Sequence, residues 1–428
     1  MQTERLYKIF QQHPHVQTDT RALAPRQLFF ALKGPNFNGN TFAAKALEMG
    51  AIAVVVDEET GISDDRIILV DDVLQALQAL ALHHRQQFNI PFIAITGSNG
   101  KTTTKELIHA VLSTQYRTYT TKGNLNNHIG VPLTILSIKR DAEMAVIEMG
   151  ANHQKEIEGY CKIAQPTHGI INNCGKAHLE GFGGIEGIRK GKGELFDFLR
   201  ENKGTVFVNG DLEYLVSMSN GIKNIVYYGN LGGQFKTNIL KSEPFLKLEI
   251  LTELEEKKQI ETQLVGAYNK PNIEAAIIVG LNFGISLEKI INAIETYTPD
   301  NARSQLVIKG SNQVILDAYN ANPSSMKVAI ENFVTQESKN KYLFLGAMME
   351  LGEFSLDEHS TIVDQLIASG LTNTVLVGGD FGKIKHPFVY FENAENAAIW
   401  ARENCPENSL ILIKGSRSTK MEKIMQAL

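Results

Sequence analysis

The segment ITGSNGKTTTKELI, residues 95–108, constrains the fold more than any other part of the chain. It follows the apolar run FIAIT at 92–96 and precedes a helical pattern that begins at Thr102. The widespread phosphate-binding pattern G-x-x-x-x-G-K-[ST] needs a glycine where this chain has Ile95, so the loop is shorter than that pattern. A buried strand, a short glycine loop and a helix in this order predict an α/β domain with a ligand site at the end of the strand.

The loop keeps the groups that phosphate binding requires. Gly97 and Gly100 permit backbone conformations in which successive N–H groups point at an anion. Lys101 supplies a positive charge, and Thr102 supplies a hydroxyl suited to Mg²⁺. The helix that follows directs the positive end of its dipole at the same place. A Gly-Asn turn that caps a helix would explain the glycines, but it leaves the lysine and the threonines unexplained.

Composition excludes several functional classes. A chain of 428 residues is too long for one compact core and indicates two or three domains. Its formal net charge of -5 gives no overall basic field that favours nucleic acid or an anionic membrane. The polar N-terminal segment lacks the apolar core of a signal peptide, and no run approaches the ~20 apolar residues that span a bilayer. Cys161, Cys174 and Cys405 are widely spaced, which disfavours a disulfide framework and a zinc site. We therefore expect a cytoplasmic protein.

The order of apolar runs predicts three domains. The first is a small N-terminal α/β domain at 1–88, and NIPFIAITG then opens a central domain at 89–298. Buried strands alternate with helices in the central domain, as in a mostly parallel sheet. Within it, residues 233–264 alternate apolar and polar positions, which is typical of an antiparallel hairpin or a sheet edge. After the boundary segment TYTPDNARSQ, a further series of strands predicts a C-terminal α/β domain at 299–428.

Two polar residues follow apolar strands of the central domain. Glu148 ends the run MAVIEMG, where P-loop proteins place an acidic Mg²⁺ ligand. Gly150 stands two residues after it, at the carboxyl end of a strand where open α/β folds bind ligands. A solvated charge is the alternative interpretation of Glu148. His178 stands in the glycine-rich segment NNCGKAHLEGFGG after another strand, and a structural histidine is the alternative there.

A third group of polar residues stands near the C-terminus. Lys414, Ser416 and Arg417, in IKGSRSTKME, follow an apolar strand and precede a helical pattern. Two cations and a hydroxyl in such a turn predict a pocket for a carboxylate. A charged surface loop is the alternative.

The glycine loop and seven further segments resemble the Mur ligases, the ATP-dependent amide-forming enzymes of peptidoglycan precursor synthesis. Residues 96–103 match that family's shortened loop, T-G-[ST]-N-G-K-T-T. The resemblance continues through GNLNNHIGVP, EMGANHQKEI, NNCGKAHLEGFGG, KGKGELF, DAYNANPSSM, LGAMMELGE and KGSRSTKME, over nearly the whole chain. It implies an N-terminal domain that binds a uridine-diphosphate substrate, a central P-loop ATPase domain, and a C-terminal Rossmann-like domain that binds an incoming dipeptide and part of ATP.

Within this family, DAYNANPSSM and KGSR look most like the ligase that acts last. That enzyme joins D-alanyl-D-alanine to UDP-N-acetylmuramoyl-tripeptide. The segment TDTRALAPRQLFFALKG resembles its uridine-diphosphate-binding segment, although Thr20 and Arg26 replace a usual serine and glycine. The preceding Mur ligase and a folylpolyglutamate synthase are alternatives within the class, against which DAYNANP argues. A P-loop kinase or GTPase lacks support because no N-K-x-D motif occurs, and a non-catalytic nucleotide-binding module is a third alternative.

The resemblance implies an ATP site whose loop amides and Lys101 hold the β and γ phosphates. Asn269 and Asn272 match asparagines on the adenine side, although a helix cap beside Pro271 is compatible with both. Arg303 matches an arginine that reaches the phosphates, and Asp317 matches the carboxylate that binds the ribose. The implied nucleotide-binding residues are Gly97, Ser98, Asn99, Gly100, Lys101, Thr102, Thr103, Asn269, Asn272, Arg303 and Asp317.

The resemblance also implies two Mg²⁺ ions. Thr102 and Glu148 would ligate the first ion, and His178 would ligate the second. Lys192, in GKGELF, matches a lysine that family members can carbamylate with CO₂, which would make it an anionic ligand of the second ion. A surface lysine is the alternative. The residues with implied catalytic roles are Lys101, His178, Lys192 and Arg303.

The implied reaction proceeds through an acyl phosphate. ATP would phosphorylate the terminal carboxylate of the tripeptide, and the amine of D-alanyl-D-alanine would displace phosphate. Asn322 also fits the N-cap of a helix that begins at Pro323, so a cap and a substrate contact are both open. We expect a monomer that binds its small-molecule substrates through Thr20, Arg21, Asn126, Asn127, Tyr319, Asn320, Asn322, Lys414, Ser416 and Arg417.

Overall fold

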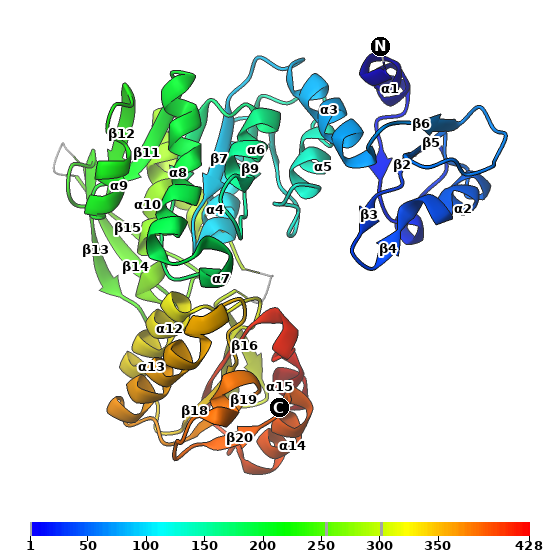
Figure 1. The fold of residues 1–428 in the computed structure, drawn as a ribbon. Helices are drawn as coiled ribbons and strands as arrows, with labels where there is room; N and C mark the ends of the chain where they lie inside the picture. The colour runs from blue at the N-terminus through cyan, green and yellow to red at the C-terminus, as the bar shows by residue number, and fades with distance from the viewer. Residues whose placement is uncertain (1, 253–255, 300–302) are drawn as a thin grey trace. The chain divides into compact units, whose positions relative to one another are not determined.

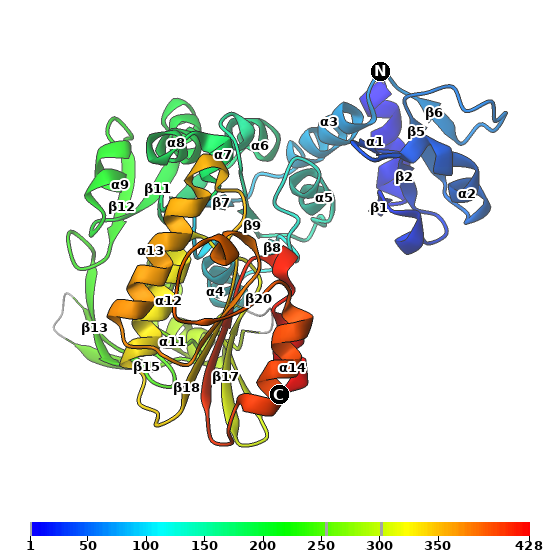
Figure 2. The ribbon, with the colours of Figure 1, turned by 60° about the horizontal axis from the view of Figure 1, so that its bottom comes forward.

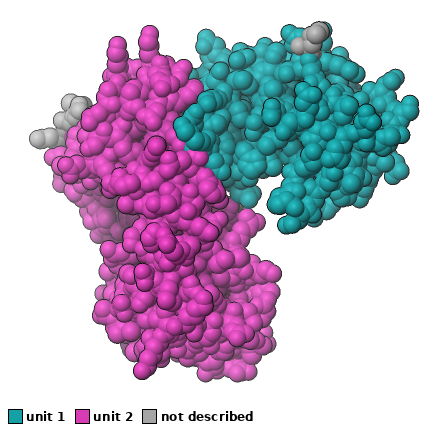
Figure 3. Space-filling model, in the orientation of Figure 1, with its two compact units in different colours: residues 1–94, 116–151, 155–169 teal, residues 95–115, 152–154, 170–428 magenta. Residues whose placement is uncertain are grey.

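The computed structural model describes residues 2–252, 256–299 and 303–428. Within these ranges the chain forms two compact units, which Figure 3 draws in different colours. The first unit comprises residues 1–94, 116–151 and 155–169, and the second comprises residues 95–115, 152–154 and 170–428. The α/β class predicted from the sequence is confirmed (Figure 1).

A small parallel sheet begins the first unit. Its strands, in sheet order, are β1 (Val16–Gln17), β2 (Leu28–Phe30), β5 (Ala53–Val56) and β6 (Ile67–Leu69). Each pair of neighbours is parallel. Phe29 and Val54 belong to one buried apolar cluster with Ala46 of helix α2 (Ala43–Glu48). Because successive side chains of a strand point to opposite faces of the sheet, only alternate strand positions contact this helix. The other elements here are α1 (Gln2–Gln12), η1 (Thr20–Ala22), β3 (Lys33–Gly34), β4 (Phe37–Asn38), η2 (Gly39–Phe42) and α3 (Val73–Arg85).

A six-stranded sheet carries the glycine loop, and its strand order is β12-β11-β10-β7-β9-β8. The strands are β7 (Phe92–Thr96), β8 (Thr118–Thr120), β9 (Met144–Glu148), β10 (His168–Ile171), β11 (Thr205–Asn209) and β12 (Asn224–Tyr228). Strands β7 and β9 are buried at every position, which explains their uninterrupted apolar runs. The pairs β8–β9 and β11–β12 are parallel. The accompanying helices are α4 (Lys101–Ser113), α5 (Gly130–Leu136), α6 (Glu156–Ala164), α7 (Leu179–Phe182), α8 (Ile185–Glu201), α9 (Glu213–Met218), η3 (Ala267–Asn269), α10 (Lys270–Asn282) and α11 (Leu287–Thr296).

The alternating segment at 233–264 forms an antiparallel sheet, as its pattern predicts. Its strands are β13 (Phe235–Lys241), β14 (Lys247–Thr252) and β15 (Lys257–Glu261). Leu248 and Ile250 are buried while Lys247, Glu249 and Leu251 beside them are partly exposed, so the alternation reflects one covered face. Residues 253–255 of the predicted segment lie outside the described ranges.

A second six-stranded sheet forms the C-terminal part of the second unit, in the order β16-β17-β21-β18-β19-β20. Its strands are β16 (Gln305–Lys309), β17 (Asn312–Asp317), β18 (Lys341–Gly346), β19 (Thr374–Val377), β20 (Val389–Phe391) and β21 (Leu410–Lys414). β16 is antiparallel to β17, and the other pairs are parallel.

Helices cover this second sheet on both faces. In Figure 2, α12 (Pro323–Thr335) and α13 (Ser355–Ala368) lie on one side and α14 (Ala394–Asn404) on the other. Val314 and Ile411 share a buried cluster with Ala397 of α14 and Ile424 of α15 (Glu422–Ala427). The short turns are η4 (Gly352–Phe354), η5 (Gly379–Lys383) and η6 (Arg417–Thr419).

The domain limits at 88/89 and 298/299 stay predictions. The boundary segment TYTPDNARSQ includes residues 300–302, which lie outside the described ranges. Among the described helices, none is both long and apolar enough to cross a membrane.

Candidate active site

The glycine loop joins β7 to α4 in a conformation that needs glycine. Gly97 has a φ of 145° and Gly100 has a φ of 80°, and α4 begins at Lys101 rather than at the predicted Thr102. A Cβ atom on Gly100 would lie 2.4 Å from Oδ1 of Asn272, so even alanine would collide there. Lys101 Nζ donates to the carbonyl of Gly97 at 2.7 Å, which holds its charge over the loop. The loop therefore has the geometry of an anion-binding turn at a helix N-terminus.

The remaining loop residues are fixed by neighbouring strands and helices. Ser98 Oγ donates to the carbonyl of Gly175 at 2.7 Å, and the amide N–H of Asn99 donates to Oδ1 of Asn173 at 3.0 Å. Thr102 is buried and Thr103 is half-buried on the first turn of α4.

Asn272 and Asn269 lie beneath the loop in a chain of buried side-chain amides. Asn272 Oδ1 accepts from the hydroxyl of Thr104 at 3.0 Å, and its Nδ2 donates to Oδ1 of Asn269 at 2.9 Å. Asn269 Nδ2 donates to the carbonyl of Val265 at 2.8 Å. Asn269 occupies the N-cap position of α10, but its side chain makes no capping hydrogen bond. The amides therefore support the loop, and their contact with adenine stays a prediction.

Glu148 is buried at the end of β9, with a relative exposure of 1%, so a solvated charge is the wrong interpretation. Its Oε1 accepts from Asn126 Nδ2 at 2.8 Å, and its backbone N–H donates to the hydroxyl of Thr121 at 3.0 Å. Asn126, predicted as a substrate contact, thus orients the carboxylate. Asn127 acts differently, because its Oδ1 accepts from the N–H of Gly130 at 2.8 Å at the start of α5.

His178 has a partner that is not among the site residues predicted from the sequence. Its Nδ1 is hydrogen-bonded to the carboxylate of Glu350, and this bond lowers the pKa of Glu350. Both residues adopt left-handed backbone conformations, with φ values of 55° and 60°. Such conformations are costly away from glycine and concentrate at functional sites. The segment LGAMMELGE supplied the only signal, since Glu350 is one of its acidic residues.

Lys192 is buried in α8 with a relative exposure of 1%, so a surface lysine is the wrong interpretation. Its ammonium nitrogen lies 4.9 Å from the centre of the Phe182 ring, over the face that attracts a cation. Carbamylation of Lys192 stays a prediction.

The metal-binding predictions can be tested against the chemistry of the donors. A hydroxyl, a carboxylate and an imidazole are present at Thr102, Glu148 and His178. No group of three or more His, Cys, Asp or Glu side chains that could hold a metal occurs within the described residues. Mg²⁺ commonly binds through one or two carboxylates together with substrate phosphates and water rather than in an all-protein cage. Oxygen donors of the kind that Mg²⁺ takes are therefore present at Thr102 and Glu148, and the two Mg²⁺ ions stay a prediction.

A second polar cluster lies at the carboxyl ends of β17 and β21. Lys414 Nζ lies 2.5 Å from Oδ2 of Asp317, its register neighbour on the adjacent strand. Asp317 Oδ1 accepts from the N–H of Ser304 at 3.2 Å. Ser416 Oγ accepts from the N–H of Met349 at 3.1 Å. Lys414 and Ser416 are each 2% exposed, so their polar groups organise this edge of the sheet.

Two arginines flank Tyr319 at the same edge. The guanidinium carbon of Arg303 lies 3.8 Å from the centre of the Tyr319 ring, and that of Arg417 lies 5.6 Å from it. Arg417 is exposed, and Nε of Arg303 is buried with no hydrogen-bond partner among the described residues. Asn320 is exposed and its Oδ1 accepts from the N–H of Ala321 at 2.9 Å. The edge thus presents two cations to a ligand.

Asn322 caps α12, as one of its two interpretations predicted. Its Oδ1 accepts from the N–H of Ser325 at 2.9 Å, and the Ser325 hydroxyl accepts from the N–H of Asn322 at 3.0 Å, a capping box. Its Nδ2 donates to Oδ1 of Asn99 in the glycine loop at 2.8 Å. The start of α12 and the glycine loop are therefore in direct contact.

The N-terminal candidates lie at a turn of the first unit. Thr20 is buried and Arg21 is exposed in η1. The side-chain hydrogen bond from Arg21 lowers the pKa of Asp19 to about 2. Arg26 has a φ of 68°, a left-handed conformation that glycine adopts without the strain that a side chain brings.

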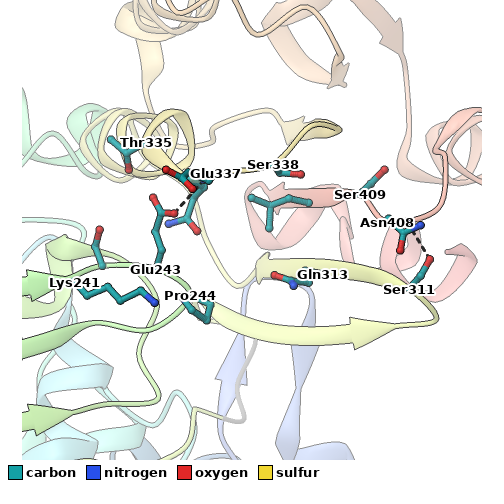
Figure 4. A pocket seen from close by; sticks show the side chains of 13 residues that line it. Lys241, Glu243, Pro244, Ser311, Gln313, Thr335, Glu337, Ser338, Asn408 and Ser409 are labelled. Carbon is teal, nitrogen blue, oxygen red and sulfur yellow. Dashed lines mark hydrogen bonds between the residues drawn. The ribbon is translucent and has the colours of Figure 1, made fainter.

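A cavity of about 670 Å³ lies at the amino ends of the strands of the C-terminal sheet, opposite the carboxyl ends that carry Asp317 and Lys414 (Figure 4). It is lined by residues 241–244 of the β13–β14 turn, residues 335–338, and the amino ends of β17 and β21. Glu243 Oε2 accepts from the N–H of Glu337 across it at 3.0 Å. Gln313 faces this cavity while Asp317 ends the same strand, so the cavity is separate from the polar clusters above.

Comparison with known proteins agrees with this architecture. Residues 14–85 match a model of the Mur ligase family catalytic domain, residues 95–280 match the Mur ligase middle domain, and residues 302–417 match the Mur ligase glutamate ligase domain. The chain is 35% identical over 431 residues to the UDP-N-acetylmuramoyl-tripeptide–D-alanyl-D-alanine ligase of Bacillus subtilis (strain 168), covering 96% of this chain and 92% of the relative.

Solved structures give the same result. The crystal structure of MurF from Acinetobacter baumannii superposes with a TM-score of 0.87 at 30% identity, covering 96% of this chain and 92% of that one. MurF ligase from Thermotoga maritima in complex with ADP gives a TM-score of 0.87 at 26% identity, covering 96% of each chain. The protein belongs to the Mur ligase family.

Proposed function

We propose that the protein joins D-alanyl-D-alanine to UDP-N-acetylmuramoyl-tripeptide and consumes ATP in peptidoglycan precursor synthesis. The observation that carries this proposal is the similarity to relatives named for that reaction, which extends over 96% of the chain at 35% and 34% identity. The segment DAYNANPSSM supports it, because its Asn322 ties the C-terminal cluster to the glycine loop. The preceding Mur ligase is the second candidate.

The glycine loop binds the phosphates of ATP. Its backbone N–H groups and the N-terminus of α4 attract the anion, and Lys101 is already held over the loop carbonyls. Arg303 adds a donor, since its buried Nε finds no partner among the described residues and requires one. Asp317 is held by Lys414 and Ser304 at the strand end, where a carboxylate can accept the ribose hydroxyls.

Mg²⁺, when bound with the nucleotide, neutralises charge on the phosphate oxygens. Thr102 and Glu148 are the residues that would hold the first ion, with Asn126 fixing the orientation of the carboxylate. His178 would hold the second, with Glu350 occupying Nδ1 so that Nε2 faces outward from that bond. Lys192, as a carbamate, would complete this set.

The reaction needs placement and charge stabilisation rather than a protein nucleophile. A carboxylate oxygen of the tripeptide attacks the γ-phosphorus, the bond to ADP breaks, and an acyl phosphate forms. The amine of D-alanyl-D-alanine then attacks the acyl carbon, and phosphate leaves. Lys101 and Arg303 stabilise the charge on the transferred group. Arg417 is the exposed cation that can take the dipeptide carboxylate, because Lys414 is already paired with Asp317.

The test is phosphate release from Mg²⁺-ATP with UDP-N-acetylmuramoyl-tripeptide, measured with and without D-alanyl-D-alanine. The proposal expects release that depends on the dipeptide, together with a UDP-N-acetylmuramoyl-pentapeptide product. Turnover with UDP-N-acetylmuramoyl-dipeptide and a single diamino acid instead would identify the preceding ligase.

A further inference from the structure

We propose that Asn322 is a positioning residue that couples the phosphate loop to the nucleotide-binding and dipeptide-binding edge of the C-terminal sheet. The part of the test below that measures turnover rests on the function proposed above, whereas the part that measures ADP affinity does not. The proposal concerns the side-chain amide of Asn322, which bonds on one side to its own helix and on the other to the glycine loop.

Both ends of the Asn322 amide are used. Oδ1 accepts from the N–H of Ser325 at 2.9 Å, and Nδ2 donates to Oδ1 of Asn99 at 2.8 Å. The side chain is 8% exposed, so these bonds are largely shielded from water. Serine and aspartate cap a helix as well as asparagine does, but neither offers an N–H group beyond the cap. A cap alone therefore does not require the amide.

Asn99 is itself held firmly enough to transmit a constraint. Its N–H donates to Oδ1 of Asn173 at 3.0 Å, and its carbonyl accepts from Nδ2 of the same residue at 3.2 Å. Asn99 stands between the two glycines of the phosphate loop, Gly97 and Gly100. A shift of its side chain therefore bears on the backbone N–H groups that face the phosphates.

A second contact brings the same helix turn against the neighbouring loop. Ser324 Oγ accepts from the N–H of Lys176 at 2.8 Å, and Lys176 Nζ lies 2.6 Å from Oε1 of Glu358 on α13. A Cβ atom on Gly175 would lie 2.8 Å from Ser324 Oγ, so the approach is close. Because Ser98 bonds the carbonyl of Gly175, this contact also reaches the phosphate loop.

The contacts fix both ends of the short segment from Asp317 to Asn322. Asp317 is anchored by Lys414, and Asn322 is anchored by Asn99. Tyr319 lies between these anchors with Arg303 and Arg417 against its ring. Asn322 and the Ser324 contact thus together set the distance between the phosphate loop and this segment. Loss of the Asn322 amide N–H group should loosen that distance without unfolding the helix.

The test uses Asn322→Ser, which keeps the cap but is too short to reach Asn99. We expect a roughly three- to tenfold weaker affinity for ADP and a similar loss of kcat/KM for ATP, the size of one hydrogen bond. The melting temperature should stay within about 2 °C of the parent, since serine is an equally good cap. The matched control is Asn393→Ser, the same change at the exposed cap of α14, where Oδ1 accepts from the N–H of Asn396 at 3.0 Å. The control should leave affinity and turnover unchanged.

A double-mutant cycle with Asn99→Ala separates coupling from two independent effects. The proposal expects Asn99→Ala to weaken ADP binding to a similar degree and the double variant to be no weaker than either single variant. It is overturned if Asn322→Ser behaves as Asn393→Ser does, or if the two losses simply multiply. A loss confined to the KM for D-alanyl-D-alanine would overturn it in favour of a direct substrate contact. Absence of ligase turnover in the parent would count against the proposed function, while the ADP cycle would still decide the coupling.

Discussion

At the scale of single residues, burial decides the interpretation of several polar side chains. Glu148 and Lys192 are each 1% exposed, although their sequence contexts also allowed surface positions. A charged group is rarely buried to this degree without a partner or a function, because desolvation is costly. Burial of these two residues therefore excludes the surface interpretation of each.

Lys192 can be tested against a neighbour on the same helix. Lys192→Met keeps the apolar stem against Phe182 but removes the nitrogen, and we expect at least a tenfold loss of kcat because the group that would hold the second Mg²⁺ is gone. Lys190→Met is the matched control, since Lys190 is exposed on α8 and should be neutral. Both variants are assayed for turnover and for melting temperature. Equal turnover in the two variants would contradict the assigned role of Lys192.

His168 predicts a pH dependence of stability. Burial lowers its pKa to about 4 at the start of β10, where its Nδ1 lies 2.8 Å from the hydroxyl of Thr167. In the unfolded chain His168 has its ordinary pKa of about 6.5. The contribution of neutral, buried His168 to the free energy of unfolding is therefore fully present above pH 6.5 and is lost as the pH falls toward 4. The difference between the pKa of His168 in the unfolded and the folded chain limits this loss of unfolding free energy to at most roughly 3 kcal/mol.

The corresponding measurement is thermal melting of the parent and of His168→Gln between pH 7.5 and 4.5. The variant should lose less stability than the parent across this range, because glutamine does not titrate. Parallel pH profiles for the two proteins would show that His168 is not the responsible group.

At the scale of elements, local sequence determines the phosphate loop. One short segment contains the run FIAIT, Gly97, Gly100 and the helical pattern that follows them. The conformation of the loop is therefore determined mainly by local sequence. The antiparallel strands β13 to β15 are likewise predictable from the sequence, because a sheet with one covered face has alternating apolar and polar residues along each strand. The cap of α12 was readable from Asn322 and Pro323 together.

Gly100→Ala tests the loop as an element. Alanine at a φ of 80° is strained, and its Cβ would lie 2.4 Å from Oδ1 of Asn272. We expect nucleotide binding to be lost, since the loop must shift to relieve the collision. Gly284→Ala is the control, because Gly284 has a φ of 74° and nothing within 4 Å of an added Cβ. The control should cost roughly 1–2 kcal/mol of stability and leave ADP affinity unchanged. Normal ADP binding by Gly100→Ala would contradict the loop assignment.

At the scale of the whole molecule, the contacts that join distant segments were not readable from one sequence. Lys414 meets Asp317 because β21 inserts between β17 and β18, and strand order across a sheet leaves no local signature. The same holds for Asn126 with Glu148, His178 with Glu350, and Asn322 with Asn99. The α/β class and the nature of the site residues followed from pattern and resemblance, whereas their partners required the three-dimensional arrangement.

The most direct test of the acyl phosphate route follows oxygen atoms through one turnover. UDP-N-acetylmuramoyl-tripeptide is labelled with ¹⁸O in both oxygens of its terminal carboxylate and incubated with Mg²⁺-ATP and D-alanyl-D-alanine, and the products are examined by mass spectrometry. An acyl phosphate predicts a pentapeptide that retains one ¹⁸O and inorganic phosphate that carries the other. Phosphate without ¹⁸O would contradict the acyl phosphate route, and the absence of a product that contains the dipeptide would contradict the proposed ligation.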